Sequence, residues 1–431
     1  MKAKKILTIL LTTIAISIII IMSLNINKIN KIENSNNEKN IINITKTFNI
    51  TKGGKYNLTG QIEDGHIYIN SNEAVYIVLN NLNIKNTSGP AIIIENAPAT
   101  TIILNENSVN TLEDGETYKD VNLDGCINSQ DDLLIKGNGK LIINSNKRGI
   151  SAKDKLIIDG GNYQINSKEE GIKANDVFDF LDGNLEIKSE LEGIKVSNKK
   201  NTNIGDFKIE NGNIKIDSVD KGISTRSKII INNGEININS KRTGIKSKNV
   251  EINNGKINIL ALENGIVASG TKVFNSLENK YYHKNDAFLT INNGKIIIDS
   301  GKDGVKINGK GNMNEGYLEI YTNYGLKSSC IDQDIEFNIN GGTLLAFGYN
   351  NKIKIPNQTS KQKTYIYKSE KTNNSKELKI KDINNVNIIN TTIKKPYQYI
   401  IISDKNIKNL EETIIQIDNQ KIENEKIKIN K

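Results

Sequence analysis

Aspartates recur at one position of a repeated sequence pattern, and carboxylates arranged in this way suit a metal ion. Asp154 and Asp176 each lie five residues after the glycine of an x-Gly-Ile motif, and Asp131 opens the matching segment one repeat earlier. If the repeats stack like neighbouring β-strands, these carboxylates lie about 4.8 Å apart and repel one another. A hard cation with oxygen ligands would relieve this repulsion, and calcium is the expected ion. Further carboxylates that could donate to such a site are Asp132, Glu170 and Glu192.

Basic side chains offer a different explanation for the same aspartates. Lys153, Lys155 and Lys173 are interleaved with them along the sequence. Lysines in solvent would neutralise the column of carboxylates without a metal. The sequence leaves both explanations open.

Three aromatic residues mark a second candidate site, which would contact substrate. Phe274, Tyr281 and Tyr282 lie in an insertion between two repeats, at residues 271–287. Aromatic faces cover sugar rings, and surface lysines pair with uronate carboxylates, so we predict that these three residues bind a saccharide. The alternative is that the rings pack the insertion against the body of the protein.

Catalytic signatures are weak. Glycoside hydrolysis needs two carboxylates at a set separation, and acidic pairs occur by chance in many of the repeats. The two histidines and two cysteines lie far apart in the sequence and form no zinc-finger spacing, Ser-His-Asp arrangement or Cys-His arrangement. We therefore predict no catalytic residues.

A repeat of about 22 residues must position all of these side chains. One submotif is x-Gly-Ile, and the other is close to Ile-x-[Asn/Gly]-Gly-x-Ile-x-Ile, as in residues 231–238. The glycines of the second submotif stand at positions 139, 161, 183, 212, 234, 255, 294, 316 and 342. Most steps are within one residue of 22, and the two largest steps indicate insertions near residues 196–207 and 271–287.

Between the glycines, apolar and polar residues alternate with the period of a β-strand. Short strands joined by tight turns, with one apolar face, should stack into a parallel β-helix, an all-β solenoid. In this fold isoleucines pack inward, glycines occupy turns that require positive φ, and asparagines can form side-chain ladders. A β-sandwich or a propeller fits less well, because a propeller blade needs about 40–45 residues. Stacking would hold Cys126 and Cys330 roughly 40 Å apart, so both are expected to be free thiols.

The N-terminus has the features of an export segment. Three lysines within the first five residues precede an uncharged, mainly apolar run over residues 6–24. Such a run is long enough to span a membrane, and no Ala-x-Ala-like cleavage site follows it. We expect an uncleaved anchor, with a cleaved signal peptide as the alternative, and the remaining chain outside the cytoplasmic membrane. The expected segments are an anchor or signal peptide (1–29), a polar tether (30–46), an N-terminal β section that caps the solenoid (47–126), β-helix coils (127–350), a linker (351–375) and a C-terminal β-module with its tail (376–431).

Composition argues against a nucleic-acid partner. The chain has 431 residues and a net charge of +9, but acidic and basic residues alternate and only three arginines are present. Base readout and phosphate clamping favour arginine. Attraction to an anionic polymer or wall is consistent with the charge, and membrane contact is expected only through the N-terminal segment.

Several short segments occur in a set order along the chain: GKYNLTG at 54–60, VLNNLNI at 78–84, GPAI at 89–92, NTLEDG at 110–115, DDLLI at 131–135, the x-Gly-Ile turns, INGGTLL at 339–345 and residues 376–422. Their order resembles a bacterial extracellular carbohydrate-binding family of parallel β-helices that bind acidic plant polysaccharide. The resemblance implies a right-handed β-helix like that of pectate lyases, with bound calcium and without demonstrated lyase activity. The chain departs from the family in acidity, because its pairs before Gly-Ile read Lys-Arg, Glu-Glu or Asp-Lys where the family favours Asp-Asp.

Together these observations predict a non-catalytic extracellular protein at the cell surface that binds an acidic polysaccharide such as polygalacturonate, with calcium assisting. One alternative is a polysaccharide lyase or hydrolase on the same scaffold, with Arg148 as the base of an elimination, although Glu170 beside it suggests a structural ion pair. Another alternative is a structural surface protein or adhesin that has no sugar ligand.

Overall fold

The protein is built almost entirely from β-strands. The computed structural model describes residues 41–198, 200–201, 203–323, 328–349, 353–374 and 376–430. Its strands form sheets of 24, 12, four and two strands, and a single 3-10 turn (η1, Asn424–Lys426) is the only helical element within the described residues. The all-β prediction is therefore confirmed. From Ile44 onward the chain forms one compact unit.

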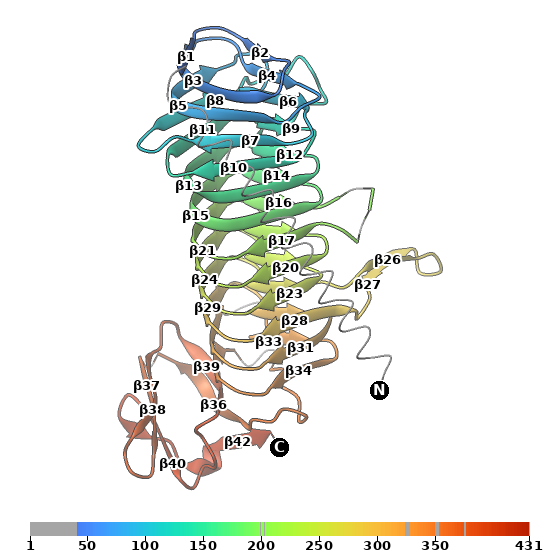
Figure 1. Cartoon of the computed structure of the whole chain (residues 1–431). Coiled ribbons are helices and arrows are strands. Elements are labelled where there is room, and N and C mark those ends of the chain that lie inside the picture. The colour runs from blue at the N-terminus through green and yellow to red at the C-terminus, as the bar shows by residue number, and fades with distance from the viewer. Residues whose placement is uncertain are drawn as a thin grey trace, which may run out of the picture. The chain divides into compact units, whose positions relative to one another are not determined.

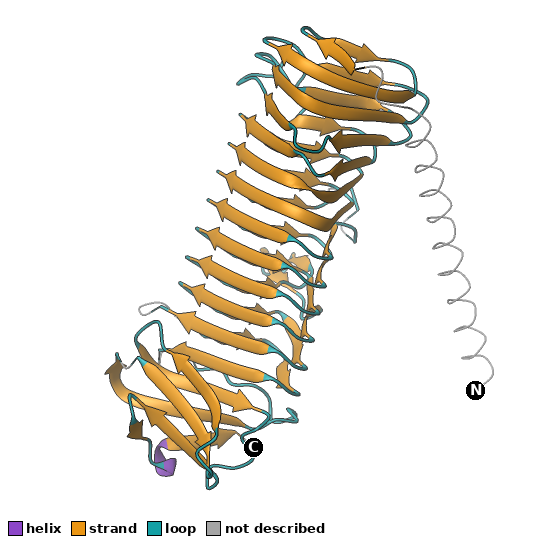
Figure 2. Ribbon diagram, turned by 60° about the vertical axis from the view of Figure 1, so that its left-hand side comes forward, coloured by secondary structure: helices purple, strands orange, loops and turns teal. Residues whose placement is uncertain are grey.

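Parallel strands are arranged in three rows, which we name A, B and C in the order in which the chain passes through them (Figures 1 and 2). Rows A and B belong to the largest sheet, and row C is the 12-stranded sheet. Four long strands cross from row A into row B: β3 (Gly54–Ile62), β5 (Val75–Lys85), β13 (Lys155–Ser167) and β15 (Val177–Ser189). Each repeat thus contributes one strand, or part of one, to every row.

The remaining strands of each row are shorter. Row A adds β7 (Thr100–Leu104), β10 (Leu133–Gly137), β17 (Asp206–Ile209), β20 (Lys228–Ile231), β23 (Asn249–Ile252), β28 (Ala287–Ile291), β31 (Gly309–Met313) and β34 (Glu336–Ile339). Row B adds β8 (Val109–Glu113), β11 (Lys140–Ser145), β18 (Asn213–Ser218), β21 (Glu235–Ser240), β24 (Lys256–Ala261), β29 (Lys295–Ser300), β32 (Tyr317–Thr322) and β35 (Thr343–Gly348). Row C consists of β2 (Phe48–Ile50), β4 (Ile67–Asn70), β6 (Ile92–Asn96), β9 (Gly125–Ser129), β12 (Arg148–Ala152), β14 (Ile172–Ala174), β16 (Ile194–Val196), β19 (Ile223–Thr225), β22 (Ile245–Ser247), β25 (Ile266–Ala268), β30 (Val305–Ile307) and β33 (Ile331–Gln333).

Strand register follows the sequence period. In row C, Ile150 pairs with Ile172 and Ile172 with Ile194, so equivalent residues of successive repeats become direct neighbours. The register holds across both predicted insertions, because Ile194 pairs with Ile223 and Ile266 with Val305. One insertion leaves the stack between β16 and β17, and the other forms an antiparallel hairpin of β26 (Lys272–Asn275) and β27 (Lys280–His283).

The two glycine motifs serve different purposes. Gly234 and its counterpart Gly255 adopt φ values of +112° and +111° in the turns from row A to row B, as expected for glycines with positive φ. For the x-Gly-Ile glycines the expectation is wrong, because none of these glycines within the described residues has a positive φ. A Cβ at Gly222 would lie 2.3 Å from Cγ2 of Ile238 and 2.7 Å from the Gly244 carbonyl oxygen. These glycines therefore allow close packing between rows and between repeats.

Isoleucines fill the interior, and asparagines connect the turns. Ile236 pairs with Ile214 and Ile257 in row B, and each of the three is at most 1% exposed. In the turns from row A to row B, each asparagine Nδ2 donates to the side-chain oxygen of the preceding repeat at 2.6–2.9 Å. This ladder runs from Glu210 through Asn232, Asn253, Asn292 and Asn314 to Asn340. The predicted asparagine ladder is confirmed.

A C-terminal module continues the chain after β35. Strands β36 (Thr364–Asn373), β39 (Tyr397–Asp404) and β42 (Ile427–Asn430) extend the large sheet with antiparallel pairing. A separate four-stranded sheet contains β37 (Glu377–Asp382), β38 (Asn387–Thr392), β40 (Thr413–Ile417) and β41 (Gln420–Lys421). Side chains of the module, such as Tyr397, share one buried cluster with Tyr321 and Phe347 of row B.

Two predicted boundaries differ from the structure. Strand β36 lies inside the segment assigned to a linker (351–375), and β1 (Ile41–Ile44) lies inside the segment assigned to a polar tether (30–46). No helix among the residues that the structure describes is long and apolar enough to cross a membrane, and the predicted anchor lies outside these residues. Cys126 and Cys330 are both buried and free, as expected.

Truncating an interior isoleucine should show how much the stack depends on its core. We expect Ile236→Ala to lower the free energy of unfolding by about 2–5 kcal/mol, because it leaves a cavity between two neighbouring isoleucines. Urea unfolding followed by circular dichroism measures this change. Leu277→Ala, in a hairpin residue that is 96% exposed, is the control and should change little. Equal effects of the two substitutions would contradict this account of the core.

Candidate functional site

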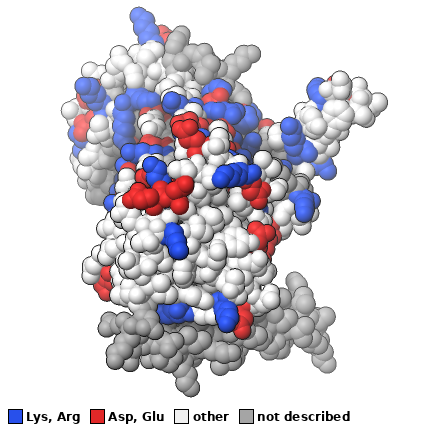
Figure 3. Space-filling view, turned by 90° about the horizontal axis from the view of Figure 1, so that it is seen from above, with Lys and Arg blue, Asp and Glu red and all other residues white. Residues whose placement is uncertain are grey.

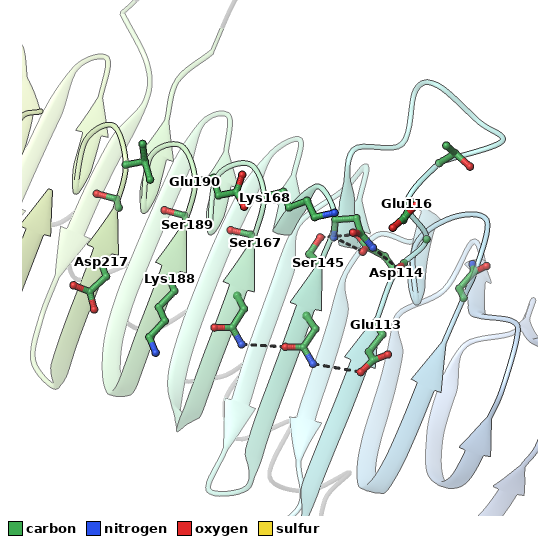
Figure 4. Close-up of a pocket in the computed structure, with 18 of the residues that line it drawn as sticks. Glu113, Asp114, Glu116, Ser145, Ser167, Lys168, Lys188, Ser189, Glu190 and Asp217 are labelled. Atoms are coloured by element: carbon green, nitrogen blue, oxygen red, sulfur yellow. Dashed lines mark hydrogen bonds between the residues drawn. The ribbon is translucent and has the colours of Figure 1, made fainter. Parts of the chain in front are cut away.

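A groove runs along the outer edge of row B, where the chain turns toward row C (Figure 4). Its volume is 1140 Å³. Each of seven consecutive repeats contributes one outward-facing residue to its lining, and each of these residues is paired with its counterpart on the next strand. They are Lys85, Glu113, Asn144, Asn166, Lys188, Asp217 and Asn239. At about 4.8 Å per strand, the row is roughly 30 Å long. A groove of this length suits an extended polymer better than a small ligand.

Local sequence creates the groove in each repeat. In the last five of the seven repeats, the outward residue is followed by a serine whose side chain is buried at the start of the turn, as at Ser145, Ser167 and Ser189. The Oγ of Ser167 donates to the Glu169 carbonyl at 3.1 Å, and that of Ser189 donates to the Leu191 carbonyl at 3.3 Å. These bonds tighten the turn and leave the outward residues as one wall of the groove.

Amides and mixed charges give the groove its chemistry. The Nδ2 of Asn166 donates to Oδ1 of Asn144 at 3.0 Å, and the Nδ2 of Asn144 donates to Glu113 at 3.4 Å. Lys188 and Asp217 continue this row on the next two strands (Figure 4). No aromatic ring is among the described residues that line the groove. A ligand in it would therefore be held by hydrogen bonds, which suits sugar hydroxyls.

The predicted aspartate column is present in the structure. Asp131, Asp154 and Asp176 precede neighbouring strands of row A, and the Asp176 backbone N–H donates to the Asp154 carbonyl at 3.3 Å. Burial raises the pKa of Asp154, and the negative charges of Asp176, Asp132 and Asp131 raise it further. The repulsion expected from the sequence therefore exists at this column.

Most of the carboxylates predicted to hold calcium already have other partners. Asp131 accepts a hydrogen bond from the Ala97 backbone at 2.7 Å, and Asp176 accepts one from Asn198 at 2.5 Å. Glu170 and Glu192 lie apart from the column, paired with basic side chains, so their chemistry does not fit calcium. Across the described part of the chain, no group of three or more His, Cys, Asp or Glu side chains is arranged to hold a metal. Calcium at Asp131, Asp132, Asp154 and Asp176 stays a prediction.

Arg148 is held in an ion-pair network on the face of row C. Its guanidinium contacts Glu170 at 2.6 Å and also pairs with Asp124, while Lys195 contacts Glu170 at 2.6 Å. Burial lowers the pKa of Arg148, but the carboxylates of Glu170 and Asp124 outweigh burial and raise it. Arg148 therefore stays protonated, and the prediction of a structural ion pair is confirmed.

Lys173, next to this network, is engaged as well. Burial, with Arg148 and Lys195 nearby, lowers the pKa of Lys173 to about 7, a value that would suit a general base. Its Nζ, however, donates to the Ala174 carbonyl, Asn175 Oδ1 and the Ser197 carbonyl at 2.7–2.9 Å. An amine with three acceptors already in place is not free to take a proton from a substrate.

The hairpin separates the three predicted aromatic residues. Phe274 pairs with Tyr281 across the hairpin, and their ring centroids lie 4.9 Å apart. Tyr282 points to the opposite face, because side chains alternate along a strand. The exposed fractions are 48% for Phe274, 62% for Tyr281 and 45% for Tyr282, so the rings are not buried against the stack.

Comparison with known proteins shows the family to which the chain belongs. A family model described as "carbohydrate-binding domain-containing protein" matches residues 45–276, which is more than half of the chain. The chain belongs to this family. One relative in the carbohydrate-binding family, from Acetivibrio thermocellus, is 40% identical over 105 residues, covering 22% of this chain and only 36% of that relative. A solved structure of a "polysaccharide lyase-like protein" from C. thermocellum, a gadolinium derivative, is similar with a TM-score of 0.41 and 30% identity, covering 50% of this chain and 91% of that one.

Sequence reasoning missed both the groove and the lysines that lie along row C. A recurrent pair of a polar residue and a serine, as in Asn144-Ser145 and Asn166-Ser167, was the signal for the groove. For row C the signal was the lysine that directly follows Gly-Ile at positions 173, 195 and 246. Both signals lie at the polar positions of the repeat, whereas the period is defined by the glycines and isoleucines.

The ion-pair network should make stability depend on pH. Burial raises the pKa of Glu170, but Arg148 and Lys195 outweigh burial and lower it, so the ionised form stabilises the fold above the ordinary value of 4.5. We expect Glu170→Gln to destabilise the protein by about 1–3 kcal/mol near neutral pH, because it removes the buried carboxylate that pairs with Arg148 and Lys195. Arg148 keeps Asp124 as a partner, and Lys195 keeps Glu192. The difference from wild type should shrink as pH falls through and below 4.5, because Glu170 itself is then protonated.

Urea unfolding at neutral and acidic pH measures this dependence. Glu186→Gln is the matched control, because Glu186 also pairs with a lysine of the next repeat, Lys215 at 2.9 Å, but on an exposed face. Its effect should be small at both pH values. A pH-independent difference between Glu170→Gln and wild type would show that charge pairing is not the cause.

Proposed function

We propose that this protein binds an extended polysaccharide without cleaving it. The observation that carries the proposal is the groove on row B, in which one outward side chain from each of seven repeats forms a continuous polar row. Membership of a carbohydrate-binding family supports a saccharide as the ligand. A polymer whose units repeat along the groove would meet a similar hydrogen-bonding position at each strand.

We further propose that the three rows form a right-handed parallel β-helix exposed outside the cell, and that the polymer is acidic. The parallel register of rows A, B and C, with equivalent residues paired repeat by repeat, supports a β-helix. The net charge of +9 supports an acidic ligand, because it favours association with polyanions. The export segment expected from the sequence supports an extracellular location.

Two observations favour binding over catalysis. Arg148, the candidate base for elimination, is held protonated by Glu170 and Asp124, and the pKa of Arg148 is raised. Lys173, a basic group whose pKa is lowered to about 7, donates to three oxygens of the chain. Neither residue is free to act as the proton acceptor that an elimination reaction requires.

Substituting one amide in the groove tests the site. We expect Asn166→Ala to weaken binding of polygalacturonate by about tenfold or less, since one hydrogen-bonding group contributes about 1 kcal/mol. Asn233→Ala is the matched control, because Asn233 also donates to the asparagine of the preceding repeat, at 3.1 Å, but lies outside the groove. Isothermal titration calorimetry with polygalacturonate and a neutral galactan measures both variants. An equal loss of affinity in the two variants would show that the groove is not the binding site.

The absence of turnover should be tested on the same polymer. We expect incubation with polygalacturonate to release neither unsaturated ends, detected by ultraviolet absorbance, nor new reducing ends. Sustained release of either product, abolished by Arg148→Lys, would replace the binding proposal with a lyase or hydrolase.

A further inference from the structure

A second cleft, between row C and the base of the β26–β27 hairpin, is strongly basic. It has a volume of 490 Å³ and is lined by basic side chains from three repeats and the hairpin, among them Lys221, Arg226, Lys246, Lys248, Lys272 and His283. None of the described residues that line it is Asp or Glu. In a chain whose acidic and basic residues otherwise alternate, this separation of charge is distinctive. Figure 3 shows Lys and Arg side chains gathered near the base of the projecting arm.

Part of this positive charge forms no direct ion pair among the described residues. Lys221 and Lys248 pair with carboxylates outside the cleft, at 2.6 Å to Asp220 and 3.0 Å to Asp286. Among the residues that the structure describes, no carboxylate lies within ion-pair distance of Arg226 or Lys246. Burial lowers the pKa of Lys246, and the neighbouring cations Lys221 and Arg242 lower it further. An anion bound beside Lys246 would relieve this repulsion.

The hairpin places two aromatic rings next to the cleft, on the same face as the hairpin residues that line it. Lys272 pairs with His283, and Phe274 pairs with Tyr281, so these four side chains share one face of the hairpin. The Nζ of Lys272 lies 4.3 Å from the centre of the Tyr281 ring. Nδ1 of His283 donates to the Gly270 carbonyl at 2.7 Å, which leaves Nε2 available to another partner. Cations next to an exposed aromatic face match a sugar that carries a negative charge.

The base of the hairpin is fixed by hydrogen bonds. Asp286 accepts from the backbone and the hydroxyl of Thr271 at 2.7 and 2.6 Å, and it pairs with Lys248. Burial raises the pKa of Asp286, but these hydrogen bonds outweigh burial and lower it, so the carboxylate stays ionised. The two strands of the hairpin therefore leave the stack at a defined place beside row C.

We propose that this basic cleft, with Phe274 and Tyr281 next to it on the hairpin, is a binding site for the anionic group of an acidic saccharide. The proposal rests on the proposed function, and it assigns recognition of the negative charge to this cleft and not to the groove, where acidic and basic residues are mixed. The anionic group is a uronate carboxylate or a sulfate ester. Arg226 and Lys246 are the side chains that would pair with it.

Calorimetry on the full chain tests the cleft, with three saccharides of equal length: oligogalacturonate, a sulfated oligosaccharide and a neutral galacto-oligosaccharide. We expect Lys246→Gln and Arg226→Gln each to weaken binding of at least one anionic probe about tenfold or more, and to leave the neutral probe unchanged. Lys256→Gln is the control, because Lys256 pairs with Glu235 at 2.8 Å on row B, away from the cleft. Tyr281→Ala should weaken binding of the same anionic probe.

Stability measurements keep the result interpretable. Lys246→Gln should not lower the thermal unfolding temperature, because it removes a partly buried charge that has no ion-pair partner among the described residues.

The chemical nature of the anionic group is identified by whether binding of the uronate probe or of the sulfated probe is weakened by the substitutions. If the folded Lys246→Gln and Arg226→Gln variants bind both anionic probes as tightly as the wild type, the cleft is not the anion-binding site. That result would not contradict the proposed role of the groove. If the wild-type protein binds none of the three probes, both the cleft and the proposed function are rejected.

Discussion

Parallel pairing between successive repeats is the interaction on which the rest of the structure depends. It converts residues about 22 positions apart in the sequence into direct neighbours, so each position of the repeat becomes a row in space. An apolar position becomes a buried row such as Ile214, Ile236 and Ile257. A polar position becomes a surface of repeated composition. The groove, the asparagine ladder and the basic face are three consequences of this one register.

Rows also concentrate charge, and the protein deals with this in two different ways. Along row C, lysines of neighbouring repeats such as Lys173 and Lys195 are direct neighbours, and carboxylates such as Glu170 in the preceding turns compensate them. Near Lys246 the compensation stops, because the turn that precedes it contributes Arg242 and Thr243 in place of a glutamate. The same scaffold therefore carries a neutralised region and a region with excess positive charge on one face.

The sequence predicted the elements that repeat and was less informative about those that do not. Glycine spacing and the alternation of isoleucine predicted the strands, the period and both insertions, because these features depend on neighbours within one repeat. The position of β36 was missed, because its pairing with β39 and β42 depends on contacts between distant parts of the C-terminal module. The aspartate column was located correctly, but its hydrogen-bond partners could not be known. Ala97, for example, lies 34 residues from the Asp131 carboxylate that it contacts.

The asparagine ladder gives the turns from row A to row B a common polarity. Each amide donates from Nδ2 to the oxygen of the repeat before it, and the series begins at the carboxylate of Glu210, which can only accept when it is ionised. Rotating one amide by half a turn would bring two oxygens together on one side and two N–H groups together on the other. Reversal is therefore an all-or-none event along the whole series, and an ionised glutamate at its first position selects one of the two directions.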